Sequence, residues 1–109
     1  MPCGAAAKAV FDGAGLVAVP DTLEQDVKSV LTKVELGEVD AGLVYRTDVI
    51  AAGDKVVGIE FPEAATAVGR YQIDLLKSTA NKDAAAGFIA FVKSPAGQKI
   101  LTDAGFGAP

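Results

Sequence analysis

A tyrosine and the beginning of a helix are the parts of this sequence best suited to bind a small anion. Tyr45 ends the apolar run 41–45, so its hydroxyl is expected at the carboxyl end of a strand, the edge at which open α/β sheets bind ligands. Residues 2–4 begin an alanine-rich helix, and the first N–H groups of a helix are unpaired and attract anions. Such uncharged donors can be spaced to fit one oxyanion in a closed cleft.

A second helix is predicted from Val27, because apolar residues recur at i, i+3, i+4 and i+7 over positions 27–34. Asp26 precedes this helix and can cap it by accepting hydrogen bonds from the first-turn amides. Gly37 suits the left-handed residue just past its end. The side chain of Val27 is expected to face the core, so any ligand role would fall to its backbone N–H.

The composition excludes several kinds of catalytic and metal site. The sequence contains no histidine, and Cys3 is its one cysteine. This removes a zinc site, a Ser-His-Asp triad, a Cys-His pair and an internal disulfide. The carboxylates of Asp40, Asp48 and Asp54 lack the spacing of a calcium loop. We therefore expect no catalytic residues, no resident metal and no cofactor.

Charge and length restrict the partners and the number of domains. A chain of 109 residues is normally one domain, and its net charge of −4 argues against nucleic acid and anionic membranes as partners. No apolar run approaches the roughly 20 residues that a membrane-spanning helix needs. Residues 1–3 follow no apolar segment, so we see neither a signal peptide nor a lipoprotein-type anchor in this sequence.

The order of the predicted elements is that of an α/β chain. The first helix is expected from residue 2 until Gly13 or Gly15 ends it, and the central helix begins at Val27. Further helices are expected briefly over 47–52, over 82–93 after a capping Asn81, and from Pro95 to about Asp103 after a capping Ser94. Short strands are expected over 16–19, 41–45, 56–61 and 71–76.

Four segments resemble the molybdate-binding proteins of bacteria, the substrate-binding subunits of molybdate ABC transporters. Gly37–Asp48 (GEVDAGLVYRTD) is similar to the family segment GEADAGIVYxTD, which carries most of the specificity. Pro2–Lys8 resembles the helix start P-x-G-x-x-A-K, and Asp26–Val27 resembles (E/N)-D-V. Ser94–Gln98, with the later Gly-Phe pair at 105–106, resembles the ending SPEGQ…GF.

The resemblance implies a truncated α/β lobe of the periplasmic-binding-protein type (type II), with a mixed sheet and flanking helices. Family members are roughly twice this length and hold the ligand in a cleft between two lobes, and this chain resembles only their later half. Residues 1–70 would be part of the second ligand-binding lobe, and residues 71–109 would return into the first lobe as a strand and two helices. The two serine-bearing loops of the first lobe have no counterpart here, so the cleft would be incomplete.

The resemblance also implies the ligand and the residues that bind it. Cys3 and Val27 would contribute backbone N–H groups and Tyr45 its phenolic hydroxyl to molybdate or tungstate, with molybdenum present only as the bound oxyanion. Cys3 is the weaker assignment, because the stretch before Val27 is slightly shortened. The partner would be the permease of an ABC importer, and the location would be the periplasm or the cell surface.

Other interpretations of the same residues stay open. Tyr45 can be a structural tyrosine with its ring in the core and its hydroxyl in water. The chain can be a fragment, or a domain that pairs with a second copy, without a working anion cleft. A Rossmann-like enzyme is weaker still, since the sequence has no glycine fingerprint and no nucleophile beside a base.

Overall fold

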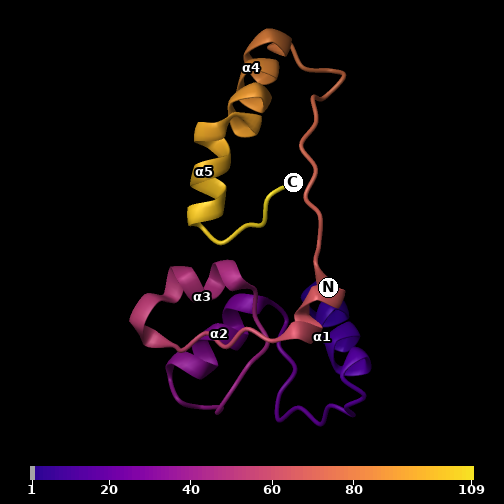
Figure 1. Cartoon of the computed structure of the whole chain (residues 1–109), viewed down its shortest axis with the longest axis vertical. Coiled ribbons are helices and arrows are strands. Elements are labelled where there is room, and N and C mark those ends of the chain that lie inside the picture. The colour runs from indigo at the N-terminus through magenta and orange to yellow at the C-terminus, as the bar shows by residue number, and fades with distance from the viewer. Residues whose placement is uncertain (1) are drawn as a thin grey trace. The chain divides into compact units, whose positions relative to one another are not determined.

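The computed structural model describes residues 2–109 of the chain (Figure 1). It divides into two compact units, Met1–Gly69 and Arg70–Pro109, which are described separately. The division lies close to the boundary expected at residue 70, but it does not test the assignment of the two parts to two lobes, which stays a prediction. No helix among residues 2–109 is both long and apolar enough to cross a membrane.

The first unit contains three α-helices and two 3-10 helices. Their bounds are α1 Pro2–Gly13, α2 Val27–Glu35, α3 Arg46–Ala52, η1 Gly53–Lys55 and η2 Pro62–Ala67. Helix α1 packs against η2, where Gly13 lies beside the side chain of Thr66. Among residues 2–109, the one apolar side chain that is buried is Val10 of α1, with 9% of its surface exposed. The apolar core of this unit is therefore small.

Helix α2 has the two ends that the sequence predicts. The Oδ1 atom of Asp26 accepts a hydrogen bond of 2.8 Å from the backbone N–H of Ser29, which confirms the N-cap. Past the other end, Gly37 has φ +71° and Glu38 donates its N–H to the carbonyl oxygen of Lys33 at 2.9 Å. Helix α1 ends in the same way, with φ +67° at Gly15. A glycine in this position lets a helix turn sharply, because it has no side chain to resist positive φ.

Segments between the helices fold back over α2 and α3. A β-carbon on Gly42 would lie 2.6 Å from Cγ1 of Val30, so the backbone of residue 42 lies directly on the apolar side of α2. Gly58 is similarly close to Val49 of α3. The close approach at Gly42 positions the segment that leads to Tyr45.

The predicted α/β lobe with a mixed sheet is wrong for this structure. None of the residues 2–109 forms a strand or a sheet, and the four segments expected as strands, 16–19, 41–45, 56–61 and 71–76, are irregular. Val17 and Val57 are 91% and 86% exposed. An apolar pattern favours extended backbone, but a strand is stable only when a neighbour accepts and donates its backbone hydrogen bonds. Within the part that the structure describes, none of these segments provides a ladder for another.

The second unit is built on two consecutive helices, α4 Lys82–Lys93 and α5 Pro95–Asp103. The hydroxyl of Ser94 accepts a hydrogen bond of 3.2 Å from the N–H of Gly97, and Pro95 occupies the first turn of α5, as predicted. Gly97 is buried against the end of α4, where a β-carbon would collide with the carbonyl oxygen of Phe91. The rings of Tyr71 and Phe106 meet edge to face at 5.9 Å between centroids.

Candidate functional site

Tyr45 precedes the first turn of α3 and is half-buried. Its backbone N–H donates a hydrogen bond of 3.0 Å to Oδ2 of Asp48. Its carbonyl oxygen accepts from the N–H groups of Asp48, at 3.0 Å, and Val49, at 3.3 Å. The backbone of Tyr45 is thus held on both sides by the first turn of α3.

Cys3 lies in the first turn of α1 and is also half-buried. Burial raises the pKa of its thiol, and the negative charge of Asp48 raises that pKa further. For this charge to act on the thiol, the Asp48 carboxylate must lie near the start of α1. Asp48 therefore acts on the beginnings of both α1 and α3, through its charge on Cys3 and its hydrogen bond with Tyr45, and we call these three residues the Asp48 neighbourhood.

Val27 is the first residue of α2 and is half-buried. The neighbouring Asp26 carboxylate accepts hydrogen bonds from both the backbone N–H and the hydroxyl of Ser29. These contacts lower the pKa of Asp26, chiefly through the backbone hydrogen bond. The local geometry explains how α2 begins but does not join Val27 to the other two residues, so its ligand role stays a prediction from the motif.

Asp48 is the residue of this neighbourhood that sequence reasoning missed. In the sequence it stands out only as one of three carboxylates that could suggest a metal site, whereas in the structure its carboxylate accepts the backbone N–H of Tyr45. The spacing from position 45 to 48 is that of a capping box, in which the third helical residue accepts from the N-cap amide. This spacing is a weak signal in the sequence, because tyrosine is not a usual N-cap residue.

The neighbouring Arg46 forms an ion pair at the surface. The Nε atom of Arg46 lies 3.2 Å from Oε1 of Glu60, and both side chains are exposed. Among residues 2–109 there is no group of three or more histidine, cysteine or acidic side chains that could hold a metal ion.

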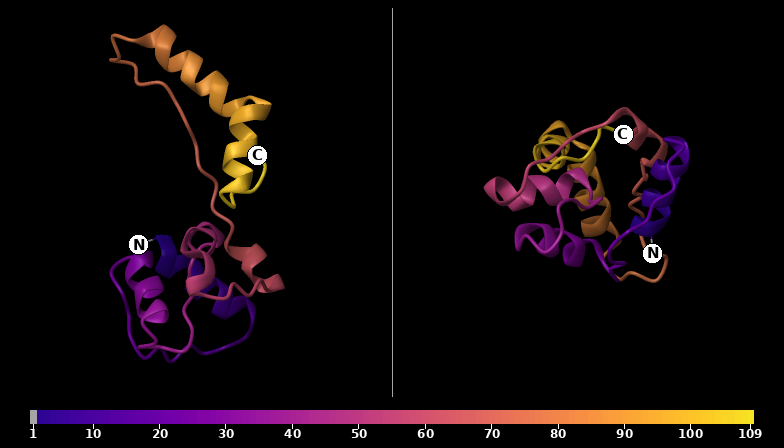
Figure 2. Two further views of the ribbon diagram at one scale, coloured as in Figure 1. Left: turned by 90° about the vertical axis from the view of Figure 1, so that its left-hand side faces the viewer. Right: turned by 90° about the horizontal axis from the view of Figure 1, so that it is seen from below.

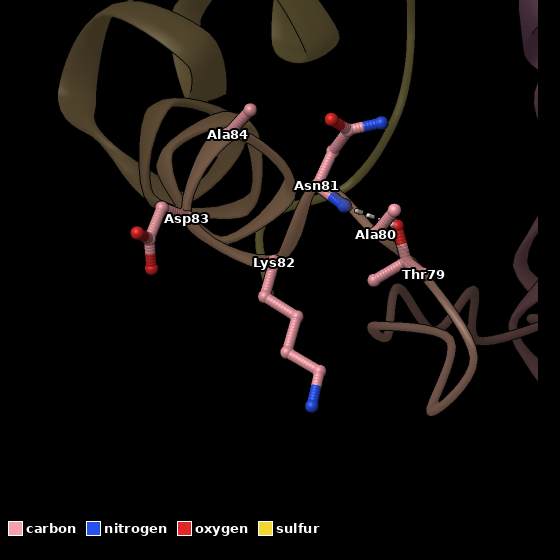
Figure 3. Close-up of a pocket in the computed structure, with 6 residues that line it drawn as sticks. All are labelled: Thr79, Ala80, Asn81, Lys82, Asp83 and Ala84. Atoms are coloured by element: carbon pink, nitrogen blue, oxygen red, sulfur yellow. Dashed lines mark hydrogen bonds between the residues drawn. The ribbon is translucent and has the colours of Figure 1, made fainter.

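The second unit has an open hollow at the beginning of α4, and its polar side chains do not converge on one point (Figure 3). Its lining is Thr79, Ala80, Asn81, Lys82, Asp83 and Ala84 (Figure 3). The side chains of Asn81, Lys82 and Asp83 diverge from one another, and the N–H of Asn81 is used in a hydrogen bond of 3.1 Å to Oγ1 of Thr79 (Figure 3). None of the predicted ligand residues lines it.

Comparison with known proteins shows the family of this chain. A family model described as bacterial extracellular solute-binding protein matches residues 1–107. The molybdate-binding protein ModA of Mycobacterium tuberculosis (strain ATCC 25618 / H37Rv) is 41% identical over 109 residues, which is 100% of this chain and 42% of that protein. ModA of Mycobacterium bovis gives the same values. These matches confirm the resemblance to molybdate-binding proteins.

A more distant relative has a broader name. The putative ABC transporter substrate-binding lipoprotein YvgL of Bacillus subtilis (strain 168) is 34% identical over 85 residues, 77% of this chain and 32% of that protein. The chain therefore spans less than half the length of the curated relatives that it matches. No solved structure matches it.

Proposed function

Because the chain belongs to the family of bacterial extracellular solute-binding proteins, we propose that it binds a tetrahedral oxyanion, molybdate or tungstate, as part of the solute-binding component of an ABC importer. The observation that carries this proposal is the 41% identity to proteins named molybdate-binding, which extends over the whole chain. The same comparison bears out the prediction that the chain is not an enzyme, since its relatives are binding proteins.

The chemistry of the site supports an oxyanion as the ligand. The N–H groups in the first turn of α1 have no partner within the helix, and the helix dipole favours negative charge at that end. The phenolic hydroxyl of Tyr45 would supply a further donor from the neighbouring start of α3. No lysine or arginine is needed, because uncharged donors can be spaced to fit one anion while a full countercharge attracts many.

The remaining assignments of this proposal follow from the names of the relatives. A permease of the ABC type would be the protein partner, and the location would be outside the cytoplasm, as for a lipoprotein or a periplasmic protein. Val27 would contribute its backbone N–H as the motif implies. The cleft would be completed either by further chain of the same protein or by a second copy.

Isothermal titration calorimetry with molybdate, tungstate and sulfate tests the function directly. We expect heat of binding with molybdate and tungstate and much weaker binding of sulfate, together with a rise in melting temperature for the anions that bind. Potassium chloride at matched ionic strength is the control for non-specific salt effects. The absence of binding to all three oxyanions would contradict the proposal.

A specific observation favours one other candidate, an interaction domain or fragment without a working anion cleft. Val17, Val19, Val57 and Ile59 are each at least 80% exposed in the first unit. Apolar side chains at this level of exposure are typical of a surface that another chain covers. Sedimentation velocity of the chain, with and without molybdate, distinguishes a self-associating chain from a monomer that binds the anion.

A further inference from the structure

Asp48 connects the two parts of the candidate site that lie in one neighbourhood. Its Oδ2 atom accepts the N–H of Tyr45 at 3.0 Å, and its own N–H donates to the carbonyl oxygen of Tyr45, also at 3.0 Å. Its charge acts on the thiol of Cys3 at the beginning of α1. Asp48 is itself half-buried, so these contacts are only partly exposed to competing water.

We propose that Asp48 is a positioning residue of the oxyanion site, whose carboxylate fixes the backbone of Tyr45 and thereby sets where the phenol lies relative to the first turn of α1. The inference rests on the oxyanion-binding function proposed above. Asp48 itself does not touch the ligand; it acts through Tyr45.

The physical reason is the length of the tyrosine side chain. A small rotation of the backbone at residue 45 moves the distant hydroxyl by a much larger amount, and a donor displaced by about 1 Å loses much of its effect. A hydrogen bond from an amide to an ionised carboxylate is stronger than one to a neutral acceptor. The Asp48 carboxylate is therefore well suited to keep the turn before α3 in one conformation.

The charge of Asp48 and its hydrogen bond have opposite effects on an anion nearby. The negative charge disfavours a bound anion, whereas the hydrogen bond keeps Tyr45 in place. Asparagine retains an acceptor oxygen and removes the charge, while alanine removes both. We therefore expect Asp48→Asn and Asp48→Ala to differ in their affinity for the anion.

The first test is calorimetry with sodium molybdate on the full chain and its variants. We expect Asp48→Ala to weaken binding about fivefold or more, as for the loss of one hydrogen bond. Asp48→Asn should bind within about twofold of the unchanged chain, or more tightly, because the acceptor stays and the repulsion is gone. Asp54→Ala is the matched control, since Asp54 is an exposed aspartate in the neighbouring η1.

The outcomes separate this inference from the function on which it rests. If the unchanged chain binds molybdate and Asp48→Ala binds equally well, the positioning role is overturned and the function stands. An equal loss of affinity in Asp48→Ala and Asp48→Asn also overturns it, because the acceptor oxygen that asparagine keeps would then make no difference to binding. If the unchanged chain binds no molybdate, the proposed function fails instead.

A second readout does not depend on the ligand. We expect the amide proton of Tyr45 to exchange faster with solvent in Asp48→Ala than in Asp48→Asn or Asp54→Ala, as measured by nuclear magnetic resonance. Alkylation of Cys3 should be faster in Asp48→Asn than in the unchanged chain, because removal of the negative charge lowers the pKa of the thiol. Unchanged Tyr45 exchange in Asp48→Ala overturns the inference.

A measurement on the unchanged chain covers the case in which Asp48→Ala does not fold. The amide proton of Tyr45 should exchange with solvent more slowly than an unprotected amide, because it is donated to the Asp48 carboxylate. Exchange of this proton at the unprotected rate, while the helices remain folded, would also overturn the positioning role.

Discussion

Tyr45 is the residue on which the proposed oxyanion site depends most. Its hydroxyl is the one side-chain donor in the predicted ligand set, since Cys3 and Val27 would contribute only backbone N–H groups. The structure holds its backbone at the start of α3, where the residue is half-buried. The site residues could be named from the motif because the motif fixes their order along the chain, whereas the role of Asp48 depends on contacts that the motif does not encode.

Replacement of Tyr45 by phenylalanine should weaken molybdate binding by roughly tenfold to a hundredfold, because a hydrogen bond to a charged group contributes about 1.5–3 kcal/mol. The ring and its packing remain, so the variant isolates the loss of the hydroxyl. Calorimetry measures the affinity. Tyr71→Phe is the matched control, because Tyr71 is 84% exposed and is not in the ligand set. Equal affinities of Tyr45→Phe and the unchanged chain would remove the phenol from the site.

At the scale of elements, the sequence predicts the helices well and the strands badly. Helices α2 and α5 could be placed because their signals are local: an apolar repeat, a capping Asp26 or Ser94, and a glycine after the end. Strands could not be placed in the same way, because each needs a partner from elsewhere in the chain. The segment 56–61 is rich in residues that favour strands, but its own sequence does not determine which other segment it would pair with.

The junction between α4 and α5 gives a sharp test at this scale. Gly97→Ala should destabilise the second unit by at least about 1–3 kcal/mol, because the new β-carbon would overlap backbone atoms of Phe91 and Val92. Gly87→Ala, inside α4 with nothing within 4 Å, should instead stabilise it by about 0.5–1 kcal/mol through better helix propensity. Urea unfolding followed by circular dichroism measures both. Similar effects of the two variants would contradict the close packing at Gly97.

Acid should loosen the beginning of α2. The pKa of Asp26 is lowered by its hydrogen bond from Ser29, so the cap contributes stability above the unfolded pKa of about 3.9 and loses it as the pH falls through the folded pKa. We expect the amide of Ser29 to lose protection from exchange below about pH 4. Asp26→Asn caps a helix without titrating, so its Ser29 amide should stay protected at the same pH. Equal loss in the variant would assign the acid effect to other carboxylates.

At the scale of the whole molecule, exposed apolar surface is the main feature that the family assignment does not explain by itself. Val17 and Val57 are 91% and 86% exposed, and their segments pair with no other strand among the described residues. The chain spans 42% of the length of the mycobacterial relatives. In a protein of that full length, further residues are available to cover such surface, whereas the chain alone must leave it in water or associate.

We expect the chain alone to bind the dye 1-anilinonaphthalene-8-sulfonate and to self-associate at high concentration. The double variant Val17→Lys and Val57→Lys should bind less dye and remain monomeric, because two highly exposed apolar positions become charged. Ala51→Lys, at an exposed position of α3, controls for the added positive charge. Fluorescence and sedimentation velocity measure the two effects, and unchanged behaviour of the double variant would place the association elsewhere.

The two helix ends at Gly15 and Gly37 have a consequence for chemical synthesis of this protein. Both residues have φ near +70°, and a β-carbon built at either position meets nothing within 4 Å. Positive φ is the natural conformation of amino acids of the opposite hand, so D-alanine would enter both positions without strain, whereas L-alanine would be disfavoured. A chain assembled with D-alanine at these two points would also have fewer conformations open to it when unfolded, and should melt at a higher temperature than the all-L protein.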